Sequence, residues 1–269
     1  MGKRLDQLLV EKGLFPSREK AQAAIMAGTV WVNGKRAEKA GHATEETASI
    51  ELKGDTCPYV SRGGLKLARA LQSFGITMEG KVCADIGAST GGFTDCMLKN
   101  GAVQVYAVDV GYGQLDWSLR NDPRVVVMER TNARYLKPEQ LETKPVFASI
   151  DVSFISLKII VPAVVQLLEK PAEIVALIKP QFEAGKDRVG KKGVVRSPEV
   201  HLDVIKETIE MGRKMGLVCS GLTYSPIKGP EGNVEFLIYW RVGVAETDRF
   251  TEPEQVVAEA HLSLSPALH

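Results

Sequence analysis

The chain contains 269 residues, of which 44% are hydrophobic and 25% charged, and its formal net charge at pH 7 is +1. This length and apolar content are typical of a globular protein with one large domain, or with a small and a medium domain. The nearly balanced charge excludes a partner selected by bulk electrostatics alone. The charge is unevenly distributed, however, because residues 1–39 hold eight Lys or Arg against four acids.

The composition indicates neither a metal site nor a secretory or membrane segment. The four cysteines have no paired spacing, and the four histidines form no ligand cluster with them, so no metal is expected. The longest apolar region, residues 145–168, is interrupted by Asp151 and Lys158 and falls short of the ~18 apolar residues that span a bilayer. A secretory apolar region is excluded by charges near the N-terminus, at Lys3, Arg4, Asp6, Glu11 and Lys12. We expect a cytoplasmic protein with no membrane partner.

Two short helices are predicted at the start of the chain. Ser17 is a suitable N-cap for the second helix, and Gly28 is placed to end it. The first helix is indicated by leucines that share one helical face, Leu5, Leu8, Leu9 and Leu14.

A small hairpin is predicted after the second helix. Val30–Val32 has strand composition, and Asn33-Gly34 favours a type I′ turn, which joins antiparallel strands. A returning strand is expected near residues 49–52. Residues 1–57 therefore form a predicted α+β domain of their own.

This N-terminal pattern resembles the S4 RNA-binding domain. The resemblance is carried by Arg4-Leu5-Asp6, Gly13-Leu14, Ser17-Arg18, Ala21, Ile25, Gly28, Val30, Val32-Asn33-Gly34 and Gly41. It implies an RNA partner, because basic side chains on one surface neutralise phosphates. Such contacts carry no sequence information, and a solvated basic face is the alternative. The residues expected to bind RNA here are Arg4, Arg18, Lys20, Lys35 and Arg36.

Residues 58–64 are rich in Pro and Gly and are predicted to be an interdomain linker. A helix is expected from residue 65 to about residue 74, with Lys66 in its first turn. A larger domain is assigned to residues 65–245, and an acidic tail to residues 246–269. The tail is predicted to be either a last helix or disordered.

The loop at residues 85–95 has the composition of a cofactor site. It follows a short apolar strand at residues 81–84 and precedes a predicted helix from Phe93 to Leu98. A second apolar strand, residues 105–108, ends at Asp109, where an acid in a doubly wound sheet binds ribose hydroxyls. The spacing is not the G-x-G-x-x-G of dinucleotide sites and fits S-adenosyl-L-methionine better. The predicted donor-binding residues in and after this loop are Asp85, Gly87, Ala88, Ser89, Thr90, Gly91, Gly92, Phe93 and Asp109.

The same loop also contains Gly87-x-Ser89-x-Gly91, which is formally a hydrolase nucleophile elbow. His201 is the only plausible downstream base for that alternative, and we disfavour it.

Polar residues stand at the ends of three further predicted strands. Asp151 and Lys179 follow apolar runs, and Glu235 precedes one. Charges in such surroundings are costly unless they are paired. Because ligands bind at the carboxyl edge of an open α/β sheet, these residues are expected to converge there with Lys66. Structural salt bridges are the alternative reading of each one alone.

In this order, and with these neighbours, the residues resemble the FtsJ-type ribose 2′-O-methyltransferases. With an S4 unit in front, the resemblance narrows to the TlyA family, whose members are also named haemolysins, and it covers most of the chain from Lys3 to about Val242. It implies a Rossmann-like α/β methyltransferase domain, S-adenosyl-L-methionine as methyl donor and ribosomal RNA or ribosomal subunits as partner, at the 2′-hydroxyl of a cytidine. It is carried by Ser61-Arg62-Gly63-Gly64-Leu65-Lys66-Leu67, the loop at 85–95, Asp151, Leu177-Ile178-Lys179-Pro180-Gln181-Phe182 and Val234-Glu235-Phe236.

The resemblance also implies roles for individual residues. The catalytic set is Lys66, Asp151, Lys179 and Glu235. Asn132 lies where related enzymes contact the adenine of the donor, and Arg62 is added to the RNA-binding residues.

A ribose hydroxyl is a poor nucleophile at neutral pH, so its proton has to be removed or shared while oxygen, methyl carbon and sulfur are held in line. Lys179 is the candidate activating group. It acts as a base only if desolvation and Lys66 lower its pKa, and Asp151 and Glu235 oppose that shift. The alternative is that Lys179 stays protonated and stabilises the developing alkoxide as a cation.

Residues 185–196 are rich in glycine and charge and are predicted to be a mobile loop beside Lys179 that closes on RNA, with a plain solvated loop as the alternative. An amphipathic helix is expected over residues 198–215. Two other function classes remain open, an RNA-binding or ribosome-assembly module of weak activity and a membrane-lytic haemolysin. The haemolysin is disfavoured because no spanning segment or strongly amphipathic cationic helix is predicted. The oligomeric state is left open.

Overall fold

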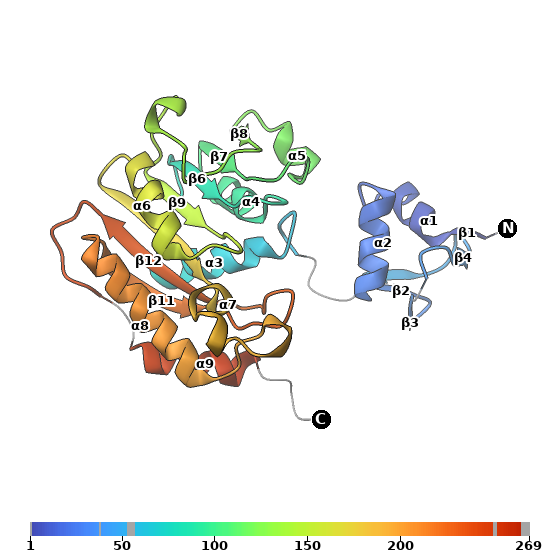
Figure 1. Ribbon diagram of the computed structural model, residues 1–269. Helices are drawn as coiled ribbons and strands as arrows, with labels where there is room; N and C mark the ends of the chain where they lie inside the picture. The colour runs from blue at the N-terminus through green and yellow to red at the C-terminus, as the bar shows by residue number, and fades with distance from the viewer. Residues whose placement is uncertain (1, 38, 53–56, 250–251, 265–269) are drawn as a thin grey trace. The chain divides into compact units, whose positions relative to one another are not determined.

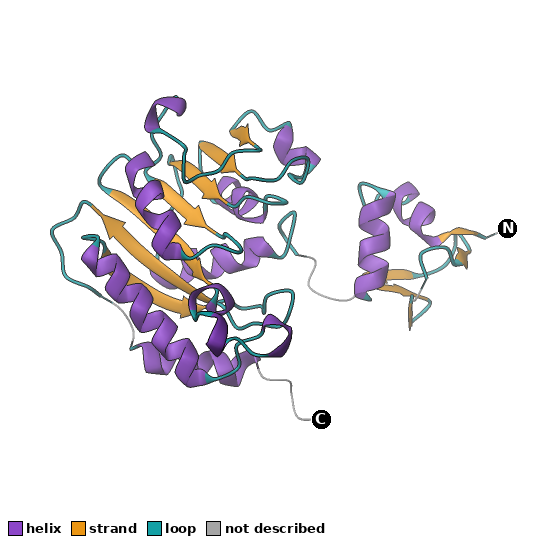
Figure 2. Cartoon of the chain, in the orientation of Figure 1, coloured by secondary structure: helices purple, strands orange, loops and turns teal. Residues whose placement is uncertain are grey.

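The computed structural model describes residues 2–37, 39–52, 57–249 and 252–264. The chain forms two compact units, Met1–Cys57 and Pro58–His269. Figure 1 colours them by position along the chain, and Figure 2 colours them by secondary structure.

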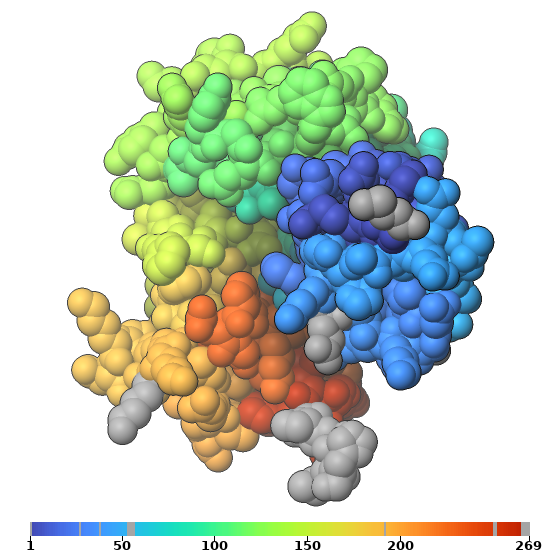
Figure 3. Space-filling model, turned by 90° about the vertical axis from the view of Figure 1, so that its right-hand side faces the viewer, coloured from blue at the N-terminus to red at the C-terminus, as the bar shows by residue number. Residues whose placement is uncertain are grey.

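The N-terminal unit is a small α+β body with its own core. Helix α1 (Leu5–Glu11) packs against α2 (Arg18–Ala27). A three-stranded sheet has the order β3-β2-β5, and β1 pairs with β4. These strands are β1 (Lys3–Arg4), β2 (Val30–Val32), β3 (Lys35–Arg36), β4 (Ala43–Thr44) and β5 (Ile50–Leu52). The buried core comprises Leu5, Leu9, Ala21, Ile25 and Val30, and the blue atoms of this unit form a compact body in Figure 3.

Most local predictions for this unit are confirmed. The Ser17 side chain accepts a hydrogen bond from the Lys20 amide and caps α2, which ends at Gly28 with φ +76°. Asn33 and Gly34 both have positive φ, as a type I′ turn requires. The turn leads to β3, however, and the predicted returning strand is β5, on the other side of β2. The prediction for Leu14 is wrong, because α1 ends at Glu11 and Leu14 is 39% exposed.

The second unit is built on a seven-stranded sheet of order β11-β12-β10-β9-β6-β7-β8. Five neighbouring strands, from β10 to β8, are parallel, and β12 runs antiparallel to both β10 and β11. The predicted Rossmann-like α/β fold is therefore confirmed. The strands are β6 (Val82–Ile86), β7 (Gln104–Val108), β8 (Val125–Met128), β9 (Phe147–Ile150), β10 (Ala172–Ile178), β11 (Val218–Tyr224) and β12 (Phe236–Val242).

Successive residues of a strand point to opposite sides of the sheet, so apolar strands present two faces that need cover. Helices cover both of these faces. Helices α3 (Gly63–Phe74), α4 (Gly92–Lys99) and α5 (Trp117–Arg120) contribute to one buried cluster. Helices α6 (Leu157–Leu167), α8 (Pro198–Lys214) and α9 (Pro253–Leu264) contribute to the other. In β6, for example, Cys83 packs in the first cluster and Ala84 in the second.

The direction of β12 decides where one charged residue lies. Its first residue, Phe236, pairs with Ile178 at the end of β10. The residue before β12 and the residue after β10 therefore stand at the same edge of the sheet. This explains why Glu235 precedes its strand, whereas Asp151 and Lys179 follow theirs.

The predicted linker is held against the second unit. The Val60 amide donates to Asp95 Oδ2 at 2.8 Å, and Lys99 Nζ donates to the Pro58 carbonyl at 2.5 Å. A Cβ on Gly64 would lie 2.3 Å from the Tyr59 ring, so only glycine lets the ring pack there. Helix α3 accordingly begins at Gly63, before the predicted start at residue 65.

Near the C-terminus, one strand was not predicted, and one of two predicted alternatives is confirmed. Strand β11 was missed, because Gly221 and a β-bulge interrupt its apolar pattern. A Cβ at Gly221 would lie 2.4 Å from the Phe74 ring, so a close helix–strand approach requires this glycine. In the acidic tail, residues 253–264 form helix α9, which buries Val256, Val257 and Ala260. The prediction of a last helix is therefore confirmed over these residues, against the alternative of disorder.

Candidate active site

Four charged side chains meet at the carboxyl edge of the large sheet. Lys66 Nζ lies 2.6 Å from Glu235 Oε2 and 3.9 Å from Asp151 Oδ2. Lys179 Nζ lies 2.5 Å from Asp151 Oδ1 and donates a hydrogen bond to Ser153 Oγ at 3.1 Å. The structure thus brings together the four predicted catalytic residues and adds Ser153, which the sequence analysis missed.

Each member of this cluster is placed by a regular element. Lys66 stands in the first turn of α3, Asp151 directly after β9 and Lys179 directly after β10. Glu235 is 1% exposed, and Lys66 and Lys179 are 8% and 9% exposed. Two amines thus face two carboxylates in a poorly solvated site, where charged groups require such partners.

A cavity of about 460 Å³ adjoins this cluster. Its size is within the range of small-molecule sites, and its walls are mainly apolar with a few polar groups, as such sites usually are. Four of the predicted donor-binding residues line it: Gly87, Ser89, Asp109 and Asn132. Polar or exposed lining residues that the sequence analysis missed are Gln114, Thr131, Ser153 and Phe154.

Asp109 lines the cavity and binds two backbone amides of the surrounding loops. Its Oδ2 accepts a hydrogen bond from the Ser89 amide at 2.8 Å, and its Oδ1 accepts one from the Gly111 amide at 2.7 Å. A carboxylate has about four acceptor positions, so it can still bind two ribose hydroxyls. This lining is compatible with S-adenosyl-L-methionine, because it combines the carboxylate of Asp109 and the amide of Asn132 with apolar walls from Ile86, Val108 and Ala133.

Replacing Asp109 by alanine is expected to raise the dissociation constant for S-adenosyl-L-methionine about 10- to 150-fold, because hydrogen bonds to a charged group are worth about 1.5–3 kcal/mol. Isothermal titration calorimetry measures this change. The matched control is Asp187→Ala, which removes an exposed carboxylate that does not line the cavity. An unchanged affinity in Asp109→Ala would remove Asp109 from the donor site.

Several predicted donor-binding residues do not line the cavity. Asp85 is fully buried beneath the loop, where it accepts hydrogen bonds from the Thr94 hydroxyl at 2.7 Å and the Ser149 hydroxyl at 3.0 Å. Burial raises its pKa to about 6, against the effect of those two bonds. Asp85 therefore ties β6 to α4 and β9, and its role is structural.

At the three loop glycines, the space that a side chain would need is filled by other protein groups. A Cβ on Gly87 would lie 2.4 Å from the Asp151 carbonyl oxygen, one on Gly91 2.3 Å from Leu119, and one on Gly92 2.4 Å from Ser61 Oγ. Ala88 and Phe93 are buried in the apolar core, and Thr90 is exposed outside the cavity. Of the glycines, only Gly87 is also a wall of the cavity.

The hydrolase alternative fails on the position of its base. His201 is 0% exposed on α8. Its Nδ1 lies 2.9 Å from His261 Nε2, and its Nε2 lies 3.2 Å from the Val195 carbonyl oxygen. Burial, with a smaller effect of His261, lowers its pKa to about 4. Both ring nitrogens are engaged by neighbouring protein groups, so His201 is a core residue.

In the N-terminal unit, a buried carboxylate holds two of the predicted RNA-binding arginines. Asp6 is 0% exposed and accepts hydrogen bonds from Arg4 at 3.1 and 3.0 Å, from Arg18 at 3.1 Å and from Gln22 at 2.7 Å. Hydrogen bonds from Arg4 first, then Gln22 and Arg18, hold the pKa of Asp6 well below its usual value, although burial opposes them. The two guanidinium groups remain about half exposed and are fixed in place.

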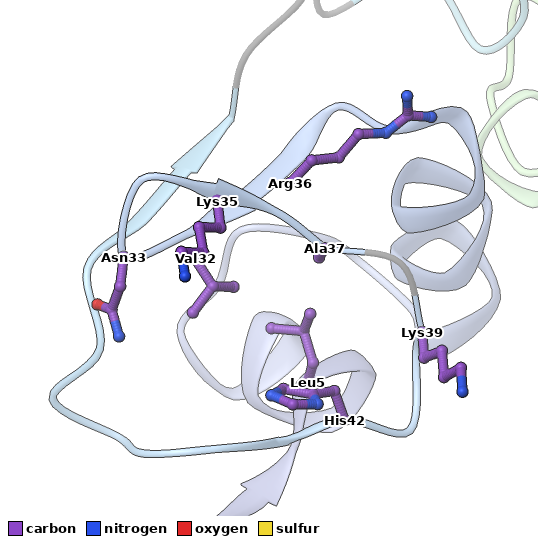
Figure 4. Close-up of a pocket in the computed structure, with 8 residues that line it drawn as sticks. All are labelled: Leu5, Val32, Asn33, Lys35, Arg36, Ala37, Lys39 and His42. Carbon is purple, nitrogen blue, oxygen red and sulfur yellow. The ribbon is translucent and has the colours of Figure 1, made fainter.

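Some of the other basic residues of this unit line an open cavity of about 720 Å³. It is lined by Lys35 and Arg36, which were predicted, and by Lys39 and His42, which were not, as Figure 4 shows. Lys20 is exposed on α2, and Arg62 is exposed at the start of α3 in the second unit. This cationic lining suits a phosphate backbone.

The segment at residues 185–196 is anchored rather than free. The Asn233 side chain accepts from the Val195 amide and donates to the Gly193 carbonyl, both at 3.0 Å. Arg188 pairs with Asp203 and Glu207 on α8. Side chains of neighbouring elements thus contact this segment near both of its ends, and its mobility stays a prediction.

Within the described ranges, no group of three His, Cys, Asp or Glu side chains is arranged to hold a metal ion. Among the helices of those same ranges, none has the length and apolar character needed to cross a membrane.

Comparison with known proteins gives the same two parts. Residues 59–242 match the FtsJ-like methyltransferase family and residues 3–45 the S4 domain. TlyA of Mycobacterium tuberculosis, named a 16S/23S rRNA (cytidine-2'-O)-methyltransferase, is 43% identical over 97% of both chains. Hemolysin A of Brachyspira hyodysenteriae is 44% identical over 88% of this chain and 99% of its own. A solved structure of a candidate hemolysin from Streptococcus thermophilus is 47% identical, with a TM-score of 0.78 over 98% and 97% of the two chains. The chain therefore belongs to the TlyA family, in which an S4 domain precedes an FtsJ-like methyltransferase domain that uses S-adenosyl-L-methionine.

Proposed function

We propose that this protein transfers a methyl group from S-adenosyl-L-methionine to the ribose 2′-hydroxyl of cytidine in ribosomal RNA. The observation that carries the proposal is the paired Lys66–Asp151–Lys179–Glu235 cluster, which adjoins the donor cavity through Asp151. The substrate follows from full-length similarity to a relative named for that reaction on 16S and 23S rRNA.

The donor, when bound, supplies a methyl group on a positively charged sulfur. The carboxylate of Asp109 would hold its ribose, and Asn132 would contact its adenine. Gly87 keeps the loop close to the Asp151 backbone, so the donor cavity and the charged cluster share a wall.

Lys179 acts on the 2′-oxygen of the acceptor ribose. Its Nζ is fixed between Asp151 Oδ1 and Ser153 Oγ, so it can hold the oxygen in line with the donor's methyl group. In its unprotonated form the amine takes the hydroxyl proton as the oxygen attacks that methyl group. Lys66 bridges Asp151 and Glu235. Lys66 and Glu235 therefore position Asp151 and, through it, Lys179.

The S4 unit supplies phosphate contacts. Replacing Arg4 and Arg18 together by glutamine is expected to weaken rRNA binding and to reduce the slope of log K against log [salt] by about 1.4–1.8, since each neutralised phosphate contributes about 0.7–0.9. Filter binding over a range of KCl measures the slope, with Lys12→Gln, an exposed lysine of the same unit, as control. An unchanged slope would remove the two arginines from the interface.

The substrate is tested with ribosomal subunits. Small subunits, large subunits and naked rRNAs that lack this modification are incubated with labelled donor, and the labelled nucleoside is identified by digestion and chromatography. We expect 2′-O-methylcytidine. Label recovered in another nucleoside would contradict the proposed acceptor.

A further inference from the structure

Gln114 brings an amide nitrogen to the wall of the donor cavity. The residue is exposed and lies in the loop between β7 and α5. Its Oε1 accepts a hydrogen bond from the Ser89 hydroxyl at 3.4 Å, whereas for its Nε2 the described residues provide no acceptor. A primary amide nitrogen carries two N–H groups, so Nε2 is available to donate to a ligand.

This nitrogen lies next to the carboxylate that holds the donor's ribose in the proposed function. A Cβ on Gly111 would lie 2.3 Å from Gln114 Nε2 and 3.0 Å from Asp109 Oδ1. Both atoms thus adjoin one point in space, and the absence of a side chain at residue 111 lets them approach it. A hydrogen-bond donor and a carboxylate acceptor therefore stand together on the same side of the cavity.

Backbone contacts on both sides of Gln114 hold the loop that carries it. The Gly113 amide donates to Glu129 Oε1 at 2.8 Å, and the side chain of Glu129 is only 9% exposed. The Asp116 amide donates to the Thr90 carbonyl at 3.2 Å. Because the backbone is already fixed, a contact between Gln114 and a ligand has to order this side chain alone, which lowers the entropic cost of binding.

A ribose hydroxyl needs both an acceptor for its proton and a donor for its oxygen. The carboxylate of Asp109 can only accept, so it leaves the hydroxyl oxygens without a donor. Two hydroxyl groups that line the same cavity, those of Ser89 and Thr131, are directed to protein oxygens at 3.4 and 3.0 Å. The amide nitrogen of Gln114 supplies the missing donor beside Asp109.

We propose that Gln114 is a specificity residue for the methyl donor, with Nε2 donating to the oxygen of a ribose hydroxyl whose proton Asp109 accepts. The proposal rests on the placement of the donor in the proposed function. A site that hydrogen-bonds a hydroxyl rejects the analogue that lacks it, because the protein groups are then left unpaired. The protein is therefore expected to prefer an intact ribose diol to a deoxyribose.

The test measures the affinity of the full-length protein for three compounds by isothermal titration calorimetry. They are S-adenosyl-L-homocysteine, which carries the same ribose as the methyl donor, and its 2′-deoxy and 3′-deoxy analogues. The variant is Gln114→Met, which keeps the length of the side chain and removes the amide. The matched control is Gln255→Met, at an exposed glutamine of α9 whose amide donates to Glu259.

With the intact ribose, Gln114→Met is expected to bind about 2- to 13-fold more weakly than the wild type, as the loss of one neutral hydrogen bond predicts. With one of the two deoxy analogues, the one that lacks the hydroxyl bound by Gln114, variant and wild type should bind equally, because the contact is already absent. The control should match the wild type on all three compounds.

Two results would overturn the contact while leaving the proposed function intact. One is an unchanged affinity of Gln114→Met for the intact compound, and the other is an equal loss on all three compounds. Failure of the wild type to bind the intact compound would instead overturn the donor cavity, and with it both the proposed function and the role of Gln114.

Discussion

Replacing Lys179 by alanine is expected to lower the rate of methyl transfer about 100- to 10,000-fold, the range over which positioned acid–base groups contribute. The physical reason is that Lys179 Nζ is the cluster's only amine bonded to both Asp151 and Ser153 among the described residues. Donor and RNA affinity should change little, because Lys179 lines neither the donor cavity nor the basic cavity of the N-terminal unit. Single-turnover transfer measures the rate, and calorimetry the donor affinity.

Two further variants decide what Lys179 does. Lys179→Arg keeps a positive charge but cannot release a proton near neutral pH. We expect it to be as inactive as the alanine variant, because we assign the hydroxyl proton to Lys179; substantial activity in the arginine variant would instead make Lys179 a cationic stabiliser. Lys144→Ala is the control, because Lys144 is exposed and lies before β9, at the other end of that strand from Asp151. Full activity in Lys179→Ala would remove the residue from the mechanism altogether.

The Lys66–Glu235 pair is expected to matter for both folding and catalysis. Lys66→Met leaves Glu235, which is 1% exposed, without its partner at 2.6 Å. Stranding one member of a buried ion pair costs about 3–5 kcal/mol. The urea midpoint of the methyltransferase unit should fall accordingly, and transfer should be lost because Asp151 is no longer held.

The double variant Lys66→Met/Glu235→Leu separates the two effects. Apolar replacement of both members removes the stranded charge, so stability should recover to near that of the wild type, while activity should stay lost. Recovery of activity along with stability would show that the pair only supports the fold. The exposed pair Lys206–Glu254, treated in the same way, is the control and should cost less than about 1 kcal/mol.

The sequence was sufficient for the fold and for the placement of the charged cluster. Residues that follow parallel strands meet at one edge of a sheet, so the order of strands and charges along the chain already predicts that Asp151 and Lys179 lie together. Glu235 joins them because β12 is antiparallel. The Ser17 cap and the Asn33-Gly34 turn were also predictable, because both depend on local chemistry.

What could not be predicted depends on contacts between distant segments. The glycines at 91 and 92 have the composition of a ligand loop but make room for Leu119 and Ser61, and composition does not reveal what a missing Cβ would touch. Asp85 was assigned to the donor for the same reason, whereas its partners are Thr94 and Ser149. Ser153 and Gln114 carried no signal of their own beyond their place in loops after strands.

The central claim is tested most directly by ribose methylation itself. Ribosomal subunits that lack the modification are incubated with labelled S-adenosyl-L-methionine and either the wild-type protein or Lys179→Ala, and the rRNA is then hydrolysed with alkali. Label in an alkali-resistant dinucleotide, formed by the wild type and absent with the variant, is the predicted result. Label released as mononucleotide, or equal labelling by both proteins, would contradict transfer to the 2′-oxygen at Lys179.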